Sequence, residues 1–464
     1  MTAAHCLFII LLCAALTAYT WGMRGTIIGG ERGALLPGAA LGLVLVFAGG
    51  SVPFSQAFPF AATIGACAMF FGGAQTYGET IDLSADSERP QRLRGHFGVL
   101  LKGALWFAVF GGVFADGMLA IVGRFNLLRT ILFAVLSTVS FGAGVVLLRL
   151  LCKKDGKLRR VLFFSRTRAE SWGGLLFVCL FLIVFNALHK QAFPLLLGLF
   201  GAVFGGLGFW FGNLLRLLIG KKCAPSSVVL RYIDPWKAME CVFGALGGAG
   251  IALGWCVMYN RYVRVLTDEL VAHSGVWDPI RDKTDNILLF AYLAFFVVYL
   301  LLSVTLKKRR ETVEDILIWP LFCAAPLCLA MTGGRLFGQL FSFGMLLFVL
   351  AEKFTLSRRE RYENLGGAKI VQCVLMLLTA AAFGVLLFTD FAFSAFQTMC
   401  LYTLGYIAAA AYLIFDPKRL RSLRAGKPSM NSAAMTLSVE WTWLICGGAL
   451  AIAALLMSGR CFLI

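Results

Sequence analysis

Long apolar stretches separated by short polar segments run through the whole chain. A transmembrane helix needs about 20 mostly apolar residues, and fourteen stretches reach or approach that length. The second, sixth and eleventh of them are short. We therefore predict about 14 transmembrane helices (range 12–14), over residues 4–22, 34–50, 54–73, 97–122, 131–151, 172–188, 193–219, 239–258, 287–306, 316–332, 336–352, 370–388, 391–415 and 440–458.

These stretches are apolar on every side, which predicts helices and not the alternating strands of an outer-membrane barrel. Composition agrees, because 59% of the residues are hydrophobic and only 14% are charged, whereas soluble proteins contain about 25% charged residues. We predict an all-α polytopic membrane protein with one integral-membrane domain over residues 1–464 and no soluble domain. A soluble enzyme is excluded.

Basic residues are distributed unevenly between alternate loops. Most of the 42 Lys and Arg residues fall in every second loop, beginning with the loop after the first span. Cytoplasmic loops collect Lys and Arg, so we predict that these loops are cytoplasmic and that both termini lie outside. Placement in a membrane, and not binding to nucleic acid, then explains the net charge of +18. No asparagine begins an N-x-[ST] sequon, which fits a bacterial cytoplasmic membrane.

Glycines recur at helical spacing in two neighbouring spans. One stripe occupies the seventh span and the other the eighth: Gly198, Gly201, Gly205, Gly208 and Gly212, then Gly244, Gly247, Gly250 and Gly254. Residues three and four apart share one helix face, and small residues let helices in a membrane approach closely. We predict that both faces are packing seams, in contact with each other or with other helices.

The third and tenth spans share a weak pattern at a constant offset. Phe58-Pro59, Cys67 and Gly72-Gly73 in one match Trp319-Pro320, Cys328 and Gly333-Gly334 in the other. This suggests halves over 1–220 and 234–464, in a layout similar to the seven-plus-seven inverted-repeat transporters such as the nucleobase and sulfate permeases. The third and tenth helices of those transporters are broken at the substrate site. No permease motif is present and the predicted termini differ, so we assign no family.

Ionisable residues in or near spans usually mark a functional or a paired structural site. An inner group comprises Arg24, Glu31 and Arg32 in a glycine-rich turn, Glu79 after the third span, and Lys237 with Glu240 at the start of the eighth. The glycine-rich turn either holds a phosphate or carboxylate or is paired internally. Glu240 is placed to cap its helix start. Together these residues can line an inward-facing cavity, or each can be an interfacial anchor.

An outer group surrounds Asp116, the deepest acidic residue. It comprises Asp116, Asn186, His189, Arg335, Gln339, Asp390 and Gln397. A buried Asp is a candidate proton or cation site, and pairing with Arg335 is the structural alternative. The longest outer loop, residues 259–286, carries five acidic residues and a predicted surface helix near 262–272. That loop is either a connector or a lid or catalytic loop.

Three functions remain open. The favoured one is a secondary transporter of a small anionic or zwitterionic solute, for which the substrate-binding candidates are Arg24, Glu31, Arg32, Glu79, Asp116, Glu240, Arg335 and Gln339. The alternatives are a membrane-embedded enzyme or flippase acting on a lipid-linked substrate, and a non-catalytic subunit of a membrane complex. An enzyme is the less favoured interpretation. The four histidines form no ligand cluster, so we expect no metal and no cofactor. The expected partners are the lipid bilayer and either a small solute or a lipid-linked substrate.

Overall fold

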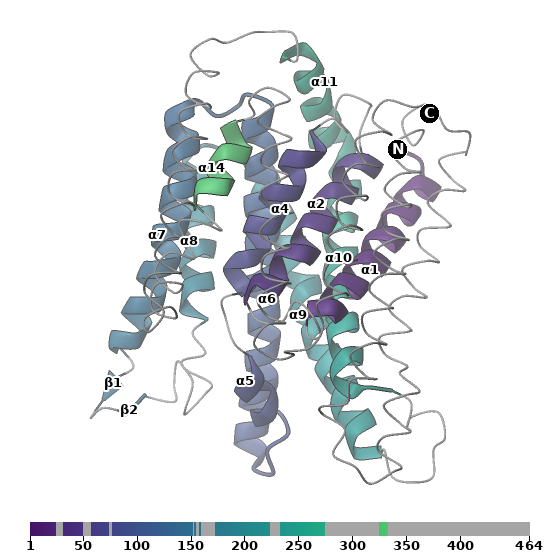
Figure 1. The fold of residues 1–464 in the computed structure, drawn as a ribbon, viewed down its shortest axis with the longest axis vertical. Helices are drawn as coiled ribbons and strands as arrows, with labels where there is room; N and C mark the ends of the chain where they lie inside the picture. The colour runs from purple at the N-terminus through teal and green to yellow at the C-terminus, as the bar shows by residue number, and fades with distance from the viewer. Residues whose placement is uncertain are drawn as a thin grey trace, which may run out of the picture.

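The computed structural model describes residues 1–24, 31–49, 57–73, 77–151, 153–154, 157–158, 172–222, 233–273 and 324–332. These residues form a bundle whose longer helices run close to the long axis of the molecule (Figure 1). Two strands of two residues each, β1 (Lys153–Lys154) and β2 (Lys157–Leu158), pair antiparallel at one end of the bundle. The described part of the chain is otherwise helical.

The elements follow one another along the chain with short connections. In order, the helices are α1 (Ala3–Arg24), the 3-10 turn η1 (Glu31–Ala34), α2 (Leu35–Gly49), α4 (Phe58–Gly73), α5 (Gly78–Leu83), α6 (Arg89–Ile121), α7 (Leu127–Leu151), α8 (Gly173–Leu188), α9 (Ala192–Lys222), α10 (Pro235–Val257), the π-helical turn η3 (Tyr259–Val263), α11 (Arg264–His273) and α14 (Ala325–Thr332).

The helices have the length and composition of membrane spans. Five of them, α1, α6, α7, α9 and α10, are long and apolar enough to cross a membrane, and α2, α4 and α8 contain shorter apolar helices. Apolar side chains also remain exposed along α7 and α8, among them Leu132, Val139, Leu180 and Val184. Water would penalise such a surface, whereas lipid would not, and the protein is accordingly a helical membrane protein.

Each of the first eight predicted spans coincides with one helix of the structure. The largest difference is at the start of α6, which begins at Arg89 and not at residue 97, with Pro90 in its first turn. Helices α7 and α10 also begin a few residues before their predicted spans. The apolar pattern reports only the part of a helix that suits lipid, so the polar first turns of α6 were missed. The predicted surface helix near 262–272 is confirmed as α11.

The later spans lie mostly outside the described residues. Of the predicted span 316–332 the structure describes residues 324–332, which contain α14. Five other predicted spans lie outside the described ranges: 287–306, 336–352, 370–388, 391–415 and 440–458. The total of fourteen spans and the repeat therefore stay predictions.

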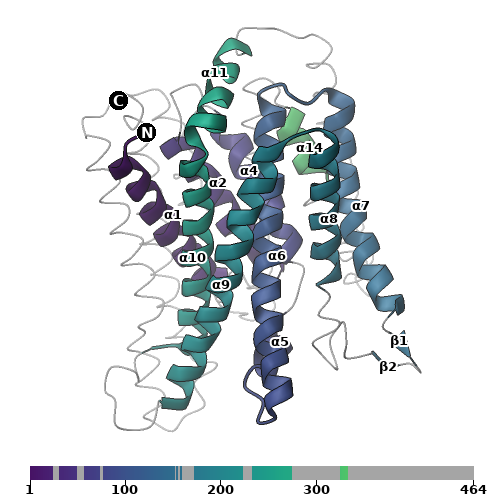
Figure 2. The same ribbon diagram turned by 180° about the vertical axis from the view of Figure 1, so that it is seen from behind.

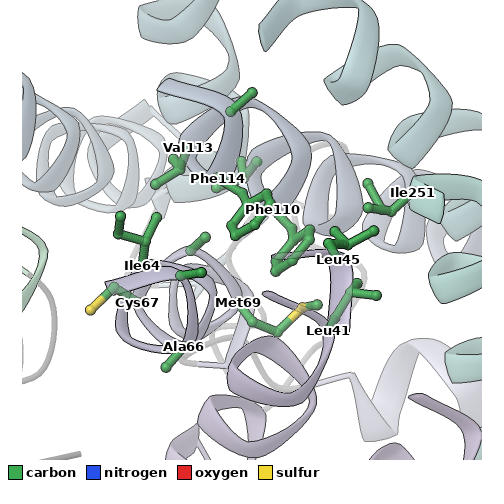
Figure 3. Close-up of a cluster of buried hydrophobic side chains, with 14 of the residues drawn as sticks. Leu41, Leu45, Ile64, Ala66, Cys67, Met69, Phe110, Val113, Phe114 and Ile251 are labelled. Carbon is green, nitrogen blue, oxygen red and sulfur yellow. The ribbon is translucent and has the colours of Figure 1, made fainter. Parts of the chain in front are cut away.

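Helix α6 is the centre of the bundle. It packs against α4, α5, α8, α9 and α14, while α10 packs between α1 and α9. Figure 3 shows Phe110 and Phe114 of α6 directed toward Leu41 and Leu45 of α2 and Met69 of α4. These side chains are completely buried. Burial of each large apolar side chain is worth about 1.5–3 kcal/mol relative to water, but in lipid the gain comes from close packing instead.

The glycine seams are confirmed as helix contacts. On α9, a Cβ at Gly201 or Gly205 would overlap a backbone carbonyl oxygen of α6, and one at Gly212 would lie 2.6 Å from the carbonyl oxygen of Met239 on α10. On α10, a Cβ at Gly244 would overlap the carbonyl oxygen of Thr17 on α1. The stripe on α9 is thus divided between α6 and α10, and the two glycine-rich helices meet along its second half.

Candidate functional site

The start of α10 gathers charged and aromatic side chains inside the bundle. Asp234 is the N-cap of this helix, and its side chain accepts a hydrogen bond of 3.0 Å from the backbone N–H of Trp236. The prediction that Glu240 caps the helix start is therefore wrong. Glu240 lies one turn further along the helix, where a 3.6-residue period brings it beside Trp236 and Lys237.

Glu240 is buried and accepts three hydrogen bonds. Its Oε1 accepts from Trp236 Nε1 at 3.1 Å and from the hydroxyl of Tyr77 at 3.1 Å. Its Oε2 accepts from Lys237 Nζ at 3.1 Å, in an ion pair whose side chains are both less than a tenth exposed. A buried ion pair is tolerated only when further hydrogen bonds satisfy its remaining polar atoms, and this carboxylate meets that condition.

Lys237 connects this group to α1. Its Nζ donates a hydrogen bond of 2.9 Å to the carbonyl oxygen of Gly22, close to the end of α1. Three segments of the predicted inner group therefore meet: the end of α1, the residues around Tyr77 and the start of α10. We call Glu240, Lys237, Trp236, Tyr77 and Gly22 the Glu240 cluster.

Aromatic rings surround the Glu240 cluster. Tyr77 stacks on Trp236 with ring centroids 6.2 Å apart and meets the Phe209 ring edge-on at 5.3 Å. Trp106 of α6 donates a hydrogen bond of 2.8 Å to the carbonyl oxygen of Met69 and contacts the ring of Trp21. These rings restrict the orientation of Tyr77 and therefore hold its hydroxyl on the carboxylate.

The short helix α5 is fixed to α6 and α9 by buried polar contacts. Lys102 Nζ donates to Thr80 Oγ1 at 2.7 Å, and Asn213 Nδ2 donates to Ser84 Oγ at 2.8 Å. Arg216 Nη2 donates to the carbonyl oxygen of Ile81 at 3.1 Å. Helix α5 lies at the end of the bundle opposite α11 (Figure 1). Tyr77 precedes α5 directly, so these contacts also position the Glu240 cluster.

Replacing Asn213 by alanine should loosen α5. The change removes the donor to buried Ser84 and the acceptor of the 3.2 Å hydrogen bond from Arg216 Nε. Loss of a buried hydrogen bond costs about 1–2 kcal/mol, so backbone amides of Gly78–Leu83 should exchange with deuterium about five- to thirtyfold faster. Mass spectrometry after exchange measures this, and amides of α7 provide the internal control. Unchanged exchange in α5 would contradict the assigned anchoring.

The other predicted inner residues are placed only in part. Glu79 is half-buried in the first turn of α5, where the helix dipole favours a negative charge. Arg24 is the last residue of α1, and Glu31 and Arg32 begin η1, but their side chains lie outside what the structure describes. Arg335 and Gln339, and also Asp390 and Gln397, belong to the undescribed part of the chain.

Two members of the predicted outer group meet. Asp116 of α6 and Asn186 of α8 are completely buried, and Asn186 Nδ2 donates to Asp116 Oδ2 at 2.8 Å. Arg335, the predicted alternative partner of Asp116, lies outside the described residues.

A separate ion pair connects the loop after α6 to α11. Arg124 in that loop forms two 2.7 Å hydrogen bonds with Glu269 of α11, and these bonds raise the pKa of the Arg124 guanidinium. Within the described ranges no group of His, Cys, Asp and Glu side chains suits a metal ion.

Sequence reasoning missed several members of these sites. Tyr77 and Trp236 were not identified as partners of Glu240. The available signal for Trp236 was its position four residues before an acidic residue on a helix, where side chains meet. Tyr77 gave no such signal, because its contact with Glu240 spans 163 positions.

Comparisons with known proteins give no relative for this chain: no protein-family model, no curated protein and no solved structure matches it.

Proposed function

We propose that this membrane protein is a secondary transporter of a small anionic or zwitterionic solute. The observation that carries the proposal is the Glu240 cluster, a charged and aromatic group buried among apolar helices. Charged side chains inside a membrane are costly and usually belong to a pathway for solutes or ions. Both an acid and a base are present, together with aromatic rings and a tyrosine hydroxyl.

The Glu240 cluster includes a residue that directly precedes a helix. Tyr77 is the N-cap of α5, and its backbone is not helical. Transporters commonly place the substrate where a helix is discontinuous, because backbone groups freed there can bind polar ligands. The non-helical backbone of Tyr77, with its hydroxyl on Glu240, supports such a role for Tyr77.

The contact between α4 and α14 also supports the proposal. Helix α14 occupies part of the predicted tenth span and packs against α4, which occupies the predicted third span. Figure 2 shows α14 beside α6 and α7 near the same end of the bundle as α11. Two halves related by an inverted repeat would bring the third and tenth helices together. We therefore propose that the chain contains an inverted repeat. We also propose that both termini lie outside a bacterial cytoplasmic membrane.

The enzyme or flippase alternative depends on the acidic residues of the segment 259–286. One of them, Glu269, is engaged in the two-bonded ion pair with Arg124. A carboxylate held by a guanidinium in this way favours attachment of α11 to the loop after α6 over acid–base chemistry. A subunit without its own substrate would not require the Glu240 cluster to be charged, which makes the third alternative less favoured.

Reconstitution in proteoliposomes tests the proposal. We expect uptake of at least one labelled solute from a panel of amino acids, small carboxylates, sulfate and phosphate. Glu240→Gln and Glu79→Gln should each reduce that uptake by about ten- to hundredfold, the effect of losing a hydrogen bond to a charged group. Glu269→Gln is the matched control and should retain uptake.

Other results would overturn the proposal. Absence of uptake for the whole panel by folded protein would remove the support for transport. Loss of a cellular phenotype with Glu269→Gln and retention with Glu240→Gln would favour the enzyme or flippase instead.

A further inference from the structure

A second buried polar group lies at the end of the bundle that carries α11. Asp116 is in the last two turns of α6, Asn186 is in the last turn of α8, and Arg129 is in the first turn of α7. Figure 2 shows that these three helix ends lie at the same end of the molecule. We call Asp116, Asn186 and Arg129 the Asp116 triad. The Glu240 cluster contains none of these residues.

The first part of the Asp116 triad is a pair of acceptor oxygens. Asn186 Nδ2 donates to Asp116 Oδ2 at 2.8 Å and to the carbonyl oxygen of Leu182 at 3.0 Å. Both amide protons are therefore used, which fixes the orientation of the side chain. Asp116 Oδ1 and Asn186 Oδ1 are buried and have no hydrogen-bond donor in the described part of the chain. Each of these oxygens can accept a hydrogen bond from a positively charged donor.

The second part is a guanidinium held by two aromatic rings. The Cζ atom of Arg129 lies 3.9 Å from the ring centroid of Phe125 and 5.2 Å from that of Phe185. Stacking on a ring uses the face of a guanidinium and leaves the N–H groups on its edge available. Nε and Nη2 of Arg129 are buried, and neither has an acceptor among the described residues.

The two unpartnered nitrogens of Arg129 are suited to bind a carboxylate. Nε and Nη2 form one side of the guanidinium, where two parallel N–H groups match the two oxygens of a carboxylate. The neighbouring Arg124 uses the same two nitrogens, each at 2.7 Å from an oxygen of Glu269. Arg129 therefore presents the same pair of donors, and both of its nitrogens are buried.

The acceptor oxygens and the donor nitrogens do not satisfy each other. Arg129 lies near the pair of Asp116 and Asn186, because its Cζ is 5.2 Å from the ring centroid of Phe185, the residue next to Asn186. The structure nevertheless places no hydrogen bond or ion pair between Asp116 and Arg129 among the described residues. Each buried polar atom left unsatisfied is costly. One ligand satisfies both parts if it carries an ammonium group and a carboxylate, because its ammonium group donates to the oxygens and its carboxylate accepts from Arg129.

We propose that the Asp116 triad binds a small zwitterion of the amino-acid class. Asp116 Oδ1 and Asn186 Oδ1 receive the ammonium group, and Nε and Nη2 of Arg129 hold the carboxylate. The inference rests on the proposed transport function and narrows its substrate from an anion or zwitterion to a zwitterion. A simple anion would leave both acceptor oxygens unsatisfied, and a simple cation would leave the guanidinium edge unsatisfied.

Ligand-induced shifts of the melting temperature of the purified full chain test this site. The probes are the standard L-amino acids, and for each amino acid that shifts the melting temperature also the amine without the carboxylate and the acid without the amino group. For L-alanine these are ethylamine and propionate. We expect at least one amino acid to stabilise the protein, and its two truncated analogues to bind about ten- to hundredfold more weakly.

Two variants assign the ammonium and carboxylate contacts. Asp116→Asn should remove the discrimination between the amino acid and its deaminated analogue, since an amide cannot attract an ammonium group as a carboxylate does. Arg129→Lys keeps the charge but loses the paired donors, and should weaken amino-acid binding by about tenfold or more. The matched control is Arg124→Lys, which changes the same type of paired guanidinium in the loop and should leave binding unchanged.

The outcomes separate this inference from the proposed function. No shift with any amino acid, or a shift that survives Asp116→Asn and Arg129→Lys, would overturn the zwitterion site. If proteoliposomes nevertheless accumulate a solute from the panel, transport stands without this site. If amino acids bind through the Asp116 triad but no solute is transported, the site stands and the transport proposal fails.

Discussion

Replacing Gly201 by alanine is expected to lower the free energy of unfolding by about 1–3 kcal/mol. A Cβ at this position of α9 would overlap the carbonyl oxygen of Phe107, and it would lie 2.9 Å from Ile251 Cδ1 on α10. The carbonyl belongs to the backbone of α6, so relief requires the two helices to separate. Because lipid supplies no hydrophobic force that pushes helices together, nothing compensates for the close packing that this separation removes.

The measurement is unfolding in mixed detergent micelles, followed by circular dichroism. The matched control is Gly220→Ala in the same helix, where no described atom lies within 4 Å of an added Cβ. Alanine favours a helix over glycine by about 1 kcal/mol, so the control should be neutral or slightly more stable. Equal stability of the two variants would contradict the assignment of Gly201 to a helix contact.

The glycine stripes show what the sequence could predict. Gly201 and Gly205 share a face by helical geometry, and small residues at that spacing have one common use in membranes. The helix positions were predictable for a similar reason, because the bilayer sets both the length and the apolar character of a span. The start of α6 at Arg89 could not be predicted in this way, because the first turns of this helix are polar and leave no apolar signal.

Contacts between segments that are distant in the chain could not be predicted from the sequence. Lys237 and Glu240 are three residues apart on one helix, so their pairing could be inferred from spacing. The bond from Tyr77 to Glu240 and the bond from Asn186 to Asp116 depend on how helices pack. Spacing along the chain carries no information about such pairs. The sequence could therefore list residues of the inner and outer groups without naming the partners that they contact in the structure.

Replacing Lys237 by methionine should destabilise the protein more than Gly201→Ala does. The variant leaves the carboxylate of Glu240 buried without its ion-pair partner, although Tyr77 and Trp236 still donate to it. Removal of one member of a buried ion pair costs about 3–5 kcal/mol. It also removes the hydrogen bond from Lys237 to Gly22 of α1. We expect a large fall in the melting temperature.

The double variant Lys237→Met with Glu240→Gln tests the cause of this loss. It removes both charges, and the amide oxygen of glutamine can still accept from Tyr77 and Trp236. If the cost arises from an uncompensated charge, the double variant should be more stable than Lys237→Met alone, because replacing both members of a buried pair is often nearly neutral. A double variant that is less stable than Lys237→Met would show instead that packing and not charge dominates.

The same double variant separates a structural pair from a functional one. If the pair only holds α1 against α10, a neutral and stable replacement should preserve solute uptake in proteoliposomes. If the charges bind the solute or respond to it, the double variant should fold and yet transport at least about tenfold more slowly, as expected when a charged hydrogen bond is lost. We expect the second result, because Glu240 of this pair is bonded to Tyr77 at the non-helical start of α5, among rings that hold Tyr77 in place.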